Sequence, residues 1–159
     1  MAIDLGDKRT GLAVGDTVTE LVSPAGVLHV PIATNGGNDL LRAILKAVEE
    51  HIGPRPTEGR YSPPGELVVG LPMNMDGTEG PRARAVRAFG ARVEAESGRR
   101  VHFQDERLTS VSADWSMAQS GMTHKDKKNR RDALAAAAVL RDFLAGRRGG
   151  GGDPPVIAD

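Results

Sequence analysis

A short run of apolar residues, Glu66-Leu-Val-Val-Gly-Leu-Pro72, constrains the fold of this chain more than any other segment. A run without polar alternation is typical of a strand that is buried on both faces, because helices cover each side of its sheet. We therefore predict that this segment is a central strand and that helices pack on both faces of the sheet.

The chain before this run predicts three short strands and a helix. We expect the strands over 2–5, 11–15 and 26–30, and the tight polar turns between them favour antiparallel pairing in a meander. A helix should follow, with Asn38 as its N-cap and Gly53-Pro54 as its stop, because apolar residues recur there at helical spacing. These residues are Leu40, Leu41, Ile44, Leu45, Val48 and Ile52.

The chain after this run predicts three helices and one further strand. We expect helices over 81–97, from Thr109 or Ser110 to Met117, and over 132–145, with a strand over 101–105. The resulting order, βββαβαβαα, predicts an α/β protein with a mixed five-stranded sheet, helices on both faces and right-handed crossovers. This order is similar to that of the ribonuclease H-like fold.

The length of 159 residues suits a single domain, which we place at residues 1–145. Residues 53–65 are rich in proline and glycine, and they predict a surface loop rather than a domain boundary. From Gly146 the chain is again rich in glycine and proline, so we expect residues 146–159 to form a disordered tail.

Composition excludes several classes of protein. There is no cysteine, so disulfides, thiolate metal sites and cysteine nucleophiles are excluded. No stretch approaches the roughly 18 apolar residues of a membrane span, and no leader precedes the first strand, so we expect a soluble, cytoplasmic protein. Acidic and basic residues balance at 21 each, but one stretch is locally basic. Its cations are Lys125, Lys127, Lys128, Arg130 and Arg131.

Three acidic residues stand where the predicted fold would bring them together. Asp4 ends the first strand, Glu106 follows the fifth strand, and Asp132 begins the last helix. Each has an ordinary alternative role: a turn acid for Asp4, an ion pair with Arg107 for Glu106, and a helix cap for Asp132. Two-metal hydrolysis of phosphodiesters needs such converging carboxylates, and oxygen ligands favour Mg²⁺ or Mn²⁺.

Two further segments are candidates for substrate contacts. The loop over 71–80 carries Asn74 and Asp76, which could approach a phosphate or simply form an Asx turn. The basic stretch before Asp132 is either a solvated loop or a surface that offsets phosphate repulsion.

Four motifs in sequence order resemble those of the YqgF (RuvX) family over about residues 1–145. They are Ile-Asp-Leu-Gly-Asp-Lys-Arg-Thr-Gly from Ile3, Val-Val-Gly-Leu-Pro-Met-Asn-Met-Asp-Gly from Val68, Asp-Glu-Arg-Leu-Thr-Ser from Asp105, and Lys-Lys-Asn-Arg-Arg-Asp-Ala-Leu from Lys127. The resemblance implies a ribonuclease H-like fold related to Holliday junction resolvases. It also implies a cytoplasmic bacterial nuclease that helps to process the 5′ end of pre-16S ribosomal RNA.

The resemblance also implies the roles of individual residues. The catalytic and metal-binding positions fall on Asp4, Glu106 and Asp132, with Mg²⁺ or Mn²⁺ as the cofactor. In many ribonuclease H-like enzymes the second carboxylate ends the fourth strand, where this chain has Gly70-Leu71-Pro72, so Glu106 departs from that pattern. The expected substrate-binding residues are Lys8, Arg9, Asn74, Asp76, Arg107, Lys127, Lys128, Arg130 and Arg131.

Two other functions remain open on the sequence alone. The chain could be a junction-resolving DNase that acts on branched DNA, or a non-catalytic RNA-binding module of ribosome assembly. An actin-like ATPase needs two such domains, and the length provides one. Only five aromatic residues are present, so we expect recognition of backbone and shape rather than stacking. Pre-16S rRNA and ribosomal particles are the expected partners. The oligomeric state of the protein stays open between a monomer and a homodimer.

Overall fold

The computed structural model describes residues 1–57, 65–107 and 123–149 of the chain. Its elements follow the predicted order through the fifth strand, with a short 3-10 segment, η1, added before the first helix. The bounds are β1 Ala2–Leu5, β2 Thr10–Gly15, β3 Val22–Leu28, η1 Thr34–Gly37, α1 Asn38–Ile52, β4 Leu67–Leu71, α2 Pro81–Ser97, β5 Val101–Asp105 and α4 His124–Gly149. The helix predicted over 109–117 lies outside the described residues.

The five strands form one mixed sheet in the order β3-β2-β1-β4-β5. The β1–β2 and β2–β3 pairs are antiparallel, whereas β1–β4 and β4–β5 are parallel. The carboxyl ends of β1, β4 and β5 therefore meet at one edge of the sheet, where ligand sites of α/β sheets usually lie. The predicted mixed sheet, with β4 between two parallel neighbours, is confirmed.

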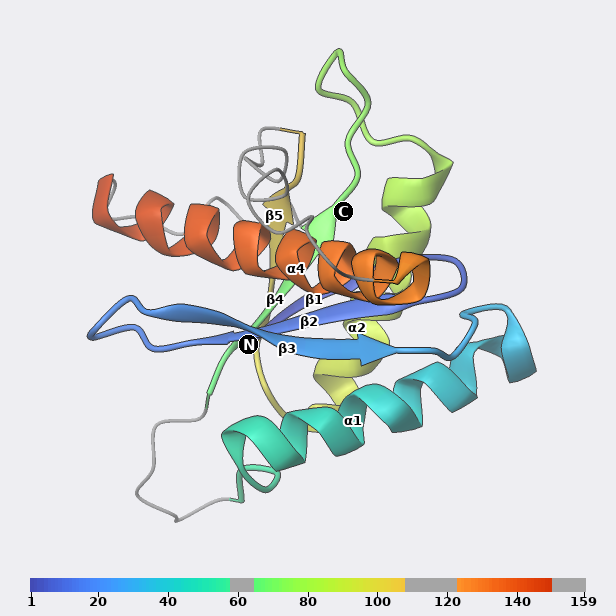
Figure 1. Cartoon of the computed structure of the whole chain (residues 1–159), viewed down its shortest axis with the longest axis horizontal. Helices are drawn as coiled ribbons and strands as arrows, with labels where there is room; N and C mark the ends of the chain where they lie inside the picture. Colours follow the sequence, from blue (N-terminus) through green and yellow to red (C-terminus); the bar gives the residue numbers. More distant parts are fainter. Residues whose placement is uncertain (58–64, 108–122, 150–159) are drawn as a thin grey trace.

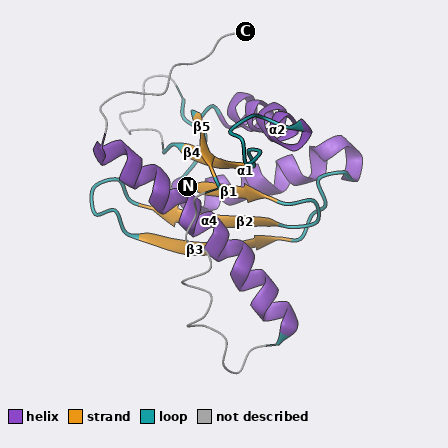
Figure 2. Cartoon of the chain, turned by 90° about the horizontal axis from the view of Figure 1, so that it is seen from above, coloured by secondary structure: helices purple, strands orange, loops and turns teal. Residues whose placement is uncertain are grey.

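One face of the sheet is covered by α1 and α2, and the other by α4 (Figure 1, Figure 2). Because side chains alternate along a strand, Ile3 and Leu5 of β1 pack with the larger core under α1 and α2. Ala2 points to the opposite face and packs with Ala136 and Ala137 of α4. Helices therefore cover both faces, as predicted. Among the described residues, no helix has the length and apolar character required to cross a membrane.

The face under α4 is built from small residues, which lets the helix main chain approach the sheet closely. Ala2 and Ala13 are fully buried there, and Gly11 of β2 and Gly70 of β4 carry no side chain. A Cβ atom at Gly11 would lie only 2.0 Å from the carbonyl oxygen of Asp132. The position of Asp132 over the sheet thus depends on glycine at residue 11.

The third strand spans Val22–Leu28, so the prediction of 26–30 was wrong in its bounds. The observed strand includes Pro24, which is tolerated because β3 is an edge strand, where a proline costs no ladder hydrogen bond. A register shift opposite Leu12 and Ala13 also takes up the irregularity around Gly26. An Asx turn, in which Asp16 Oδ1 accepts from the amides of Val18 and Thr19 at 2.8 Å, closes the preceding hairpin.

Two predicted helix starts also need correction. Asn38 is the first residue of α1 rather than its cap, and the N-cap is Gly37 in a left-handed conformation with φ of 82°. The last helix begins at His124 instead of Asp132, so the basic stretch is helical and not a loop. Its start has a Thr-x-x-Asp pattern, in which the Asp126 amide donates to Thr123 Oγ1 at 3.2 Å. The two polar turns before residue 132 carry no apolar periodicity, which is why the sequence did not reveal them.

The carboxyl end of α4 continues to Gly149, so the predicted tail boundary at Gly146 falls inside a helix. Two arginines beyond that boundary hold the helix end against the sheet. Arg147 Nη1 lies 2.8 Å from Glu66 Oε2, and Arg148 pairs with Glu20 of the β2–β3 turn. Residues 150–159 lie outside the described residues.

Arg99 joins the two ends of the predicted 53–65 loop. Arg99 is only 4% exposed, and its guanidinium donates to the carbonyl oxygens of Gly53, Pro54 and Gly65 at 2.9, 2.8 and 3.1 Å. These bonds satisfy carbonyls at the end of α1 and before β4, although residues 58–64 between them lie outside the described residues.

We predict that Gly11→Ala destabilises the protein by about 2 kcal/mol or more, because overpacking a core by a methyl group costs about 1–3 kcal/mol even without a contact this short. Urea denaturation of the full chain measures the change. Gly146→Ala is the matched control on α4, since a Cβ there meets nothing within 4 Å. It should be neutral or stabilising by about 0.5–1 kcal/mol, because alanine favours the helix. Equal stability of Gly11→Ala and the wild type would contradict the close approach.

Candidate active site

Asp4 lies near the end of β1 and points to the face that α4 covers. It pairs with Gly11 of β2 and shares its face with Ala2, because side chains alternate along the strand. Strand geometry therefore turns a carboxylate toward the cavity beneath α4, among residues that are otherwise small and apolar.

Glu106 directly follows β5 and extends the β4–β5 pairing by one residue, since its amide donates to the carbonyl oxygen of Leu71 at 3.2 Å. Its side chain turns back over β4 and hydrogen-bonds to Asp4. The absence of a side chain at Gly70 makes this possible. A Cβ atom at Gly70 would lie 2.8 Å from Glu106 Oε2 and 3.8 Å from Asp4 Oδ1.

Asp132 comes from the third turn of α4 and pairs with Arg9, which directly precedes β2. Arg9 Nε donates to Asp132 Oδ2 at 2.5 Å, and the two side chains are only 23% and 25% exposed. Asp132 therefore has its counter-charge in direct contact, in the guanidinium of Arg9.

The three predicted carboxylates border a single cavity of about 530 Å³. Its other walls are cationic or apolar: Arg9, Lys128, Arg131, Ala135 and Val139. Asp4 and Glu106 come from the carboxyl ends of parallel strands, and Asp132 comes from the helix above them. The structure thus brings the three predicted residues together at one cavity. The catalytic role of these residues stays a prediction.

The cavity perturbs the ionisation of its acids. Burial, followed by the negative charges of Glu106 and Asp132, raises the pKa of Asp4 to about 7. Burial also raises the pKa of Glu106. A proton shared in the Asp4–Glu106 hydrogen bond therefore relieves the repulsion between two desolvated carboxylates. Groups of this kind cluster at functional sites.

Other predicted substrate-binding residues are placed in different ways. Lys128 and Arg131 line the cavity, whereas Lys8 and Lys127 do not, and Arg130 borders a second cavity on the other side of α4. In the described part of the chain, none of these five cations forms an ion pair.

Asn74, Asp76 and Arg107 do not line the carboxylate cavity. Asp76 Oδ1 accepts from the Thr78 amide at 3.0 Å, and Asn74 Nδ2 donates to Thr78 Oγ1 at 3.0 Å. Arg107 binds Asp105 through two nitrogens and donates to the carbonyl oxygens of Asn74 and Met75, each at 3.2 Å. These side chains thus stabilise the loop after β4. For Asn74 and Asp76 this agrees with the alternative of an Asx turn rather than a substrate contact.

Comparisons with known proteins identify the family of the chain. A family model described as "RuvX: Holliday junction resolvase" matches residues 1–146. The chain belongs to the RuvX family. With the sheet order described above, this membership confirms the ribonuclease H-like α/β fold, and it makes the chain a phosphodiester-hydrolysing enzyme of the nuclease class.

Three curated relatives named "Putative pre-16S rRNA nuclease" illustrate the similarity. The protein of Anaeromyxobacter dehalogenans is 37% identical over 144 residues, which cover 91% of this chain and 94% of the relative. That of Moorella thermoacetica is 37% identical over 91% of this chain and 92% of its own length. That of Lactococcus lactis subsp. cremoris is 31% identical, again over 91% and 92%.

Nucleases of the RuvX type are generally dependent on divalent metals, and the donor atoms of the cavity fit a cation that prefers oxygen. Asp4 and Glu106 contribute carboxylate oxygens whose negative charge is unfavourable without a counter-ion. Among the described residues, however, no three acids or histidines are arranged as a metal site. The third carboxylate, that of Asp132, is instead paired with Arg9.

Three features of this RuvX-family site were missed in the sequence. Gly11 and Gly70 look like ordinary strand glycines, and only the packed helix shows why no side chain fits. Arg82, in the first turn of α2, donates to Asp7 Oδ1 at 2.7 Å and to the Leu5 carbonyl oxygen at 3.2 Å beside the site. Its place directly after Gly80-Pro81, at the sheet edge that carries the acids, was the available signal.

We predict that Asp4→Asn stabilises the metal-free protein at pH 8. In the wild type the folded pKa of about 7 lies above the ordinary aspartate pKa of 3.8, so the folded state gains stability from this group at low pH and loses it as the pH rises toward 7. The neutral asparagine avoids this loss. The variant's advantage should grow between about pH 4 and pH 7 and reach on the order of 2–4 kcal/mol, at about 1.4 kcal/mol per pKa unit.

Urea denaturation in EDTA across this pH range measures the difference. Glu96→Gln, which removes an exposed carboxylate on α2, is the matched control and should leave stability unchanged within about 0.5 kcal/mol. A variant less stable than the wild type at pH 8 would show that ionisation of Asp4 does not destabilise the folded protein.

Proposed function

We propose that the chain is a metal-dependent nuclease that cleaves pre-16S ribosomal RNA during maturation of its 5′ end in the cytoplasm. The observation that carries the proposal is the cavity in which carboxylates from β1, β5 and α4 face the cations Lys128 and Arg131. The names of the curated relatives support the choice of substrate. Ribosomal particles that contain the precursor are the corresponding partners.

In this proposal Asp4 and Glu106 hold Mg²⁺ or Mn²⁺, and Asp132 is available as a third ligand. An ion held by these residues would supply activation of a water for attack on phosphorus and stabilisation of the leaving oxygen. Asp4 and Glu106 must give up their shared proton to hold it, so cleavage should increase as the pH approaches and passes about 7.

The cations of the cavity have a separate role. Lys128 and Arg131 neutralise the phosphate that approaches three acids, which would otherwise repel it. Arg9 binds Asp132 in the absence of substrate, and a phosphate offers its guanidinium an alternative anionic partner. Substrate binding thereby releases the Asp132 carboxylate toward the other two acids.

We predict that Asp4→Asn and Glu106→Gln each lower cleavage of a labelled 5′-extended 16S precursor by more than about 100-fold, beyond the 10- to 100-fold typical for loss of an outer-shell partner of a metal. The assay compares Mg²⁺, Mn²⁺ and EDTA, and free precursor with precursor in ribosomal particles. Glu96→Gln is the control and should cleave at the wild-type rate.

A four-way DNA junction in the same assay separates the two nuclease functions, because the family model is described as a Holliday junction resolvase. Cleavage of the junction alone would replace the RNA proposal with DNA resolution. If folded protein binds the precursor but cleaves neither substrate in any of these conditions, the non-catalytic assembly role would replace both.

We also predict that Arg9→Gln binds Mn²⁺ about fivefold more tightly than the wild type in the absence of nucleic acid. Loss of the Arg9–Asp132 pair frees a carboxylate, and an interaction of about 1 kcal/mol corresponds to this factor. Isothermal titration calorimetry measures the affinity. Lys8→Gln removes an adjacent exposed charge and controls for long-range repulsion of the cation. Equal affinities of the two variants would refute competition between Arg9 and the metal.

A further inference from the structure

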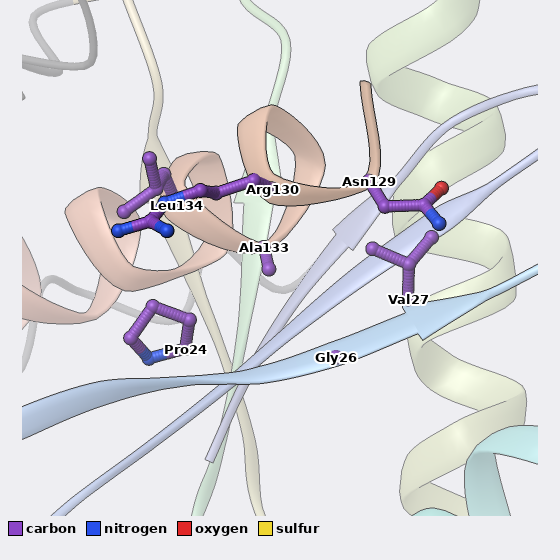
Figure 3. Close-up of a pocket in the computed structure, with 7 residues that line it drawn as sticks. All are labelled: Pro24, Gly26, Val27, Asn129, Arg130, Ala133 and Leu134. Carbon is purple, nitrogen blue, oxygen red and sulfur yellow. The ribbon is translucent and has the colours of Figure 1, made fainter. Parts of the chain in front are cut away.

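A second cavity, of about 430 Å³, lies between α4 and the edge strand β3. It is lined by Pro24, Gly26, Val27, Asn129, Arg130, Ala133 and Leu134 (Figure 3). At 3.6 residues per turn, the α4 residues of this cavity lie about half a turn from Lys128, Asp132 and Ala135, which border the carboxylate cavity. The two cavities therefore flank α4 on opposite sides of its contact with the sheet.

This second cavity, called the α4–β3 groove below, combines apolar walls with two hydrogen-bonding groups. Figure 3 shows Arg130 extending toward Leu134, across the groove from Pro24, and Asn129 opposite Val27. No acid is among the lining residues, and no described carboxylate forms an ion pair with Arg130. Gly26 leaves open space on the β3 side, where a Cβ atom would meet nothing within 4 Å.

This chemistry suits one nucleotide better than a protein surface. A base has flat apolar faces that pack against proline, leucine and a guanidinium plane, and polar edges that an asparagine amide can bind. Its phosphate is attracted to an arginine that forms no ion pair with the described carboxylates. A volume of about 430 Å³ is within the range of small-ligand sites.

The groove also lies within reach of a strand bound at the carboxylates. A helix with its side chains is about 10–12 Å wide. The first turns of α4, which lie between the two cavities, are exposed and basic. A strand whose phosphate lies beside Lys128 and Arg131 can cross these turns within a few nucleotides. We propose that the α4–β3 groove binds an unpaired nucleotide of the RNA substrate, with its base between Arg130, Leu134 and Pro24 and its edge at Asn129.

This inference rests on the proposed function only in taking the ligand to be nucleic acid, and binding can be tested without cleavage. The probes are a fluorescein-labelled single-stranded 12-nucleotide RNA and an abasic strand of the same length, titrated in EDTA by fluorescence anisotropy. The wild type should bind RNA at least tenfold more tightly than the abasic strand. The double variant Asn129→Ala/Leu134→Ala should lose about tenfold in RNA affinity and keep its affinity for the abasic strand.

Arg42→Ala, on the exposed face of α1, is the control and should bind both strands like the wild type. Asn129→Ala alone repeats the test if the double variant does not fold, and a 4-thiouridine crosslink to residues 24–27 or 129–134 gives an independent readout. Wild-type RNA affinity in the folded variants would overturn the proposal. Equal binding of RNA and abasic strand by the wild type would also overturn it, and would leave the groove to a protein partner.

The failure of one proposal is distinguishable from the failure of the other. Cleavage of the precursor by a protein whose groove variants bind RNA normally would retain the nuclease and remove the groove. Base-dependent binding in the groove by a protein that cleaves nothing would do the reverse.

Discussion

The close contact between the main chain of α4 and β2 at Gly11 determines the geometry of this molecule. A carbonyl oxygen of the helix occupies the space in which any other residue would place its Cβ atom. Ala2, Ala13 and Gly70 extend the same small surface across three neighbouring strands. Because α4 lies this close, Asp132 is held near two strand ends, and the helix divides the surface above the sheet into two cavities.

The carboxylate cavity works against the stability of the fold. Asp4 and Glu106 are desolvated beside one another, and the rise in the pKa of Asp4 records the free energy that their ionisation costs. The opposite face of the sheet offsets this cost with a core of large aliphatic side chains, including Ile3, Leu40 and Ile44, none of which is exposed. The two faces thus divide the tasks, one stabilising the chain and the other holding charge where chemistry can use it.

Local patterns were sufficient to predict much of the fold. The bounds of β1, α2 and β5 followed from apolar alternation, a first-turn proline and flanking glycines, all of which act within a few residues. The bounds of β3 did not, because the tolerance of Pro24 depends on its strand being at the sheet edge. The first turns of α4 did not either, since they carry no apolar stripe and belong to neither hydrophobic core of the described residues.

The site shows the same division. Asp4, Glu106 and Asp132 could be brought together from topology alone, because strand ends and a covering helix define one edge. The pairing of Arg9 with Asp132, and the use of Asn74, Asp76 and Arg107 within their own loop, depend on side-chain conformation that spacing along the chain does not determine.

The carboxyl end of α4 is held by ion pairs to two other parts of the chain. The family match covers residues 1–146, and the helix continues through Arg147 and Arg148, which bind Glu66 before β4 and Glu20 in the β2–β3 turn. Phe143 extends this anchor by packing against both His102 and Arg147. The helix is thus fastened at the end remote from the acids, while its basic end lies over the cavities with its cations exposed. Arg147 and Arg148 therefore tether α4 at the end opposite to its basic first turns, which would meet nucleic acid in the proposed function.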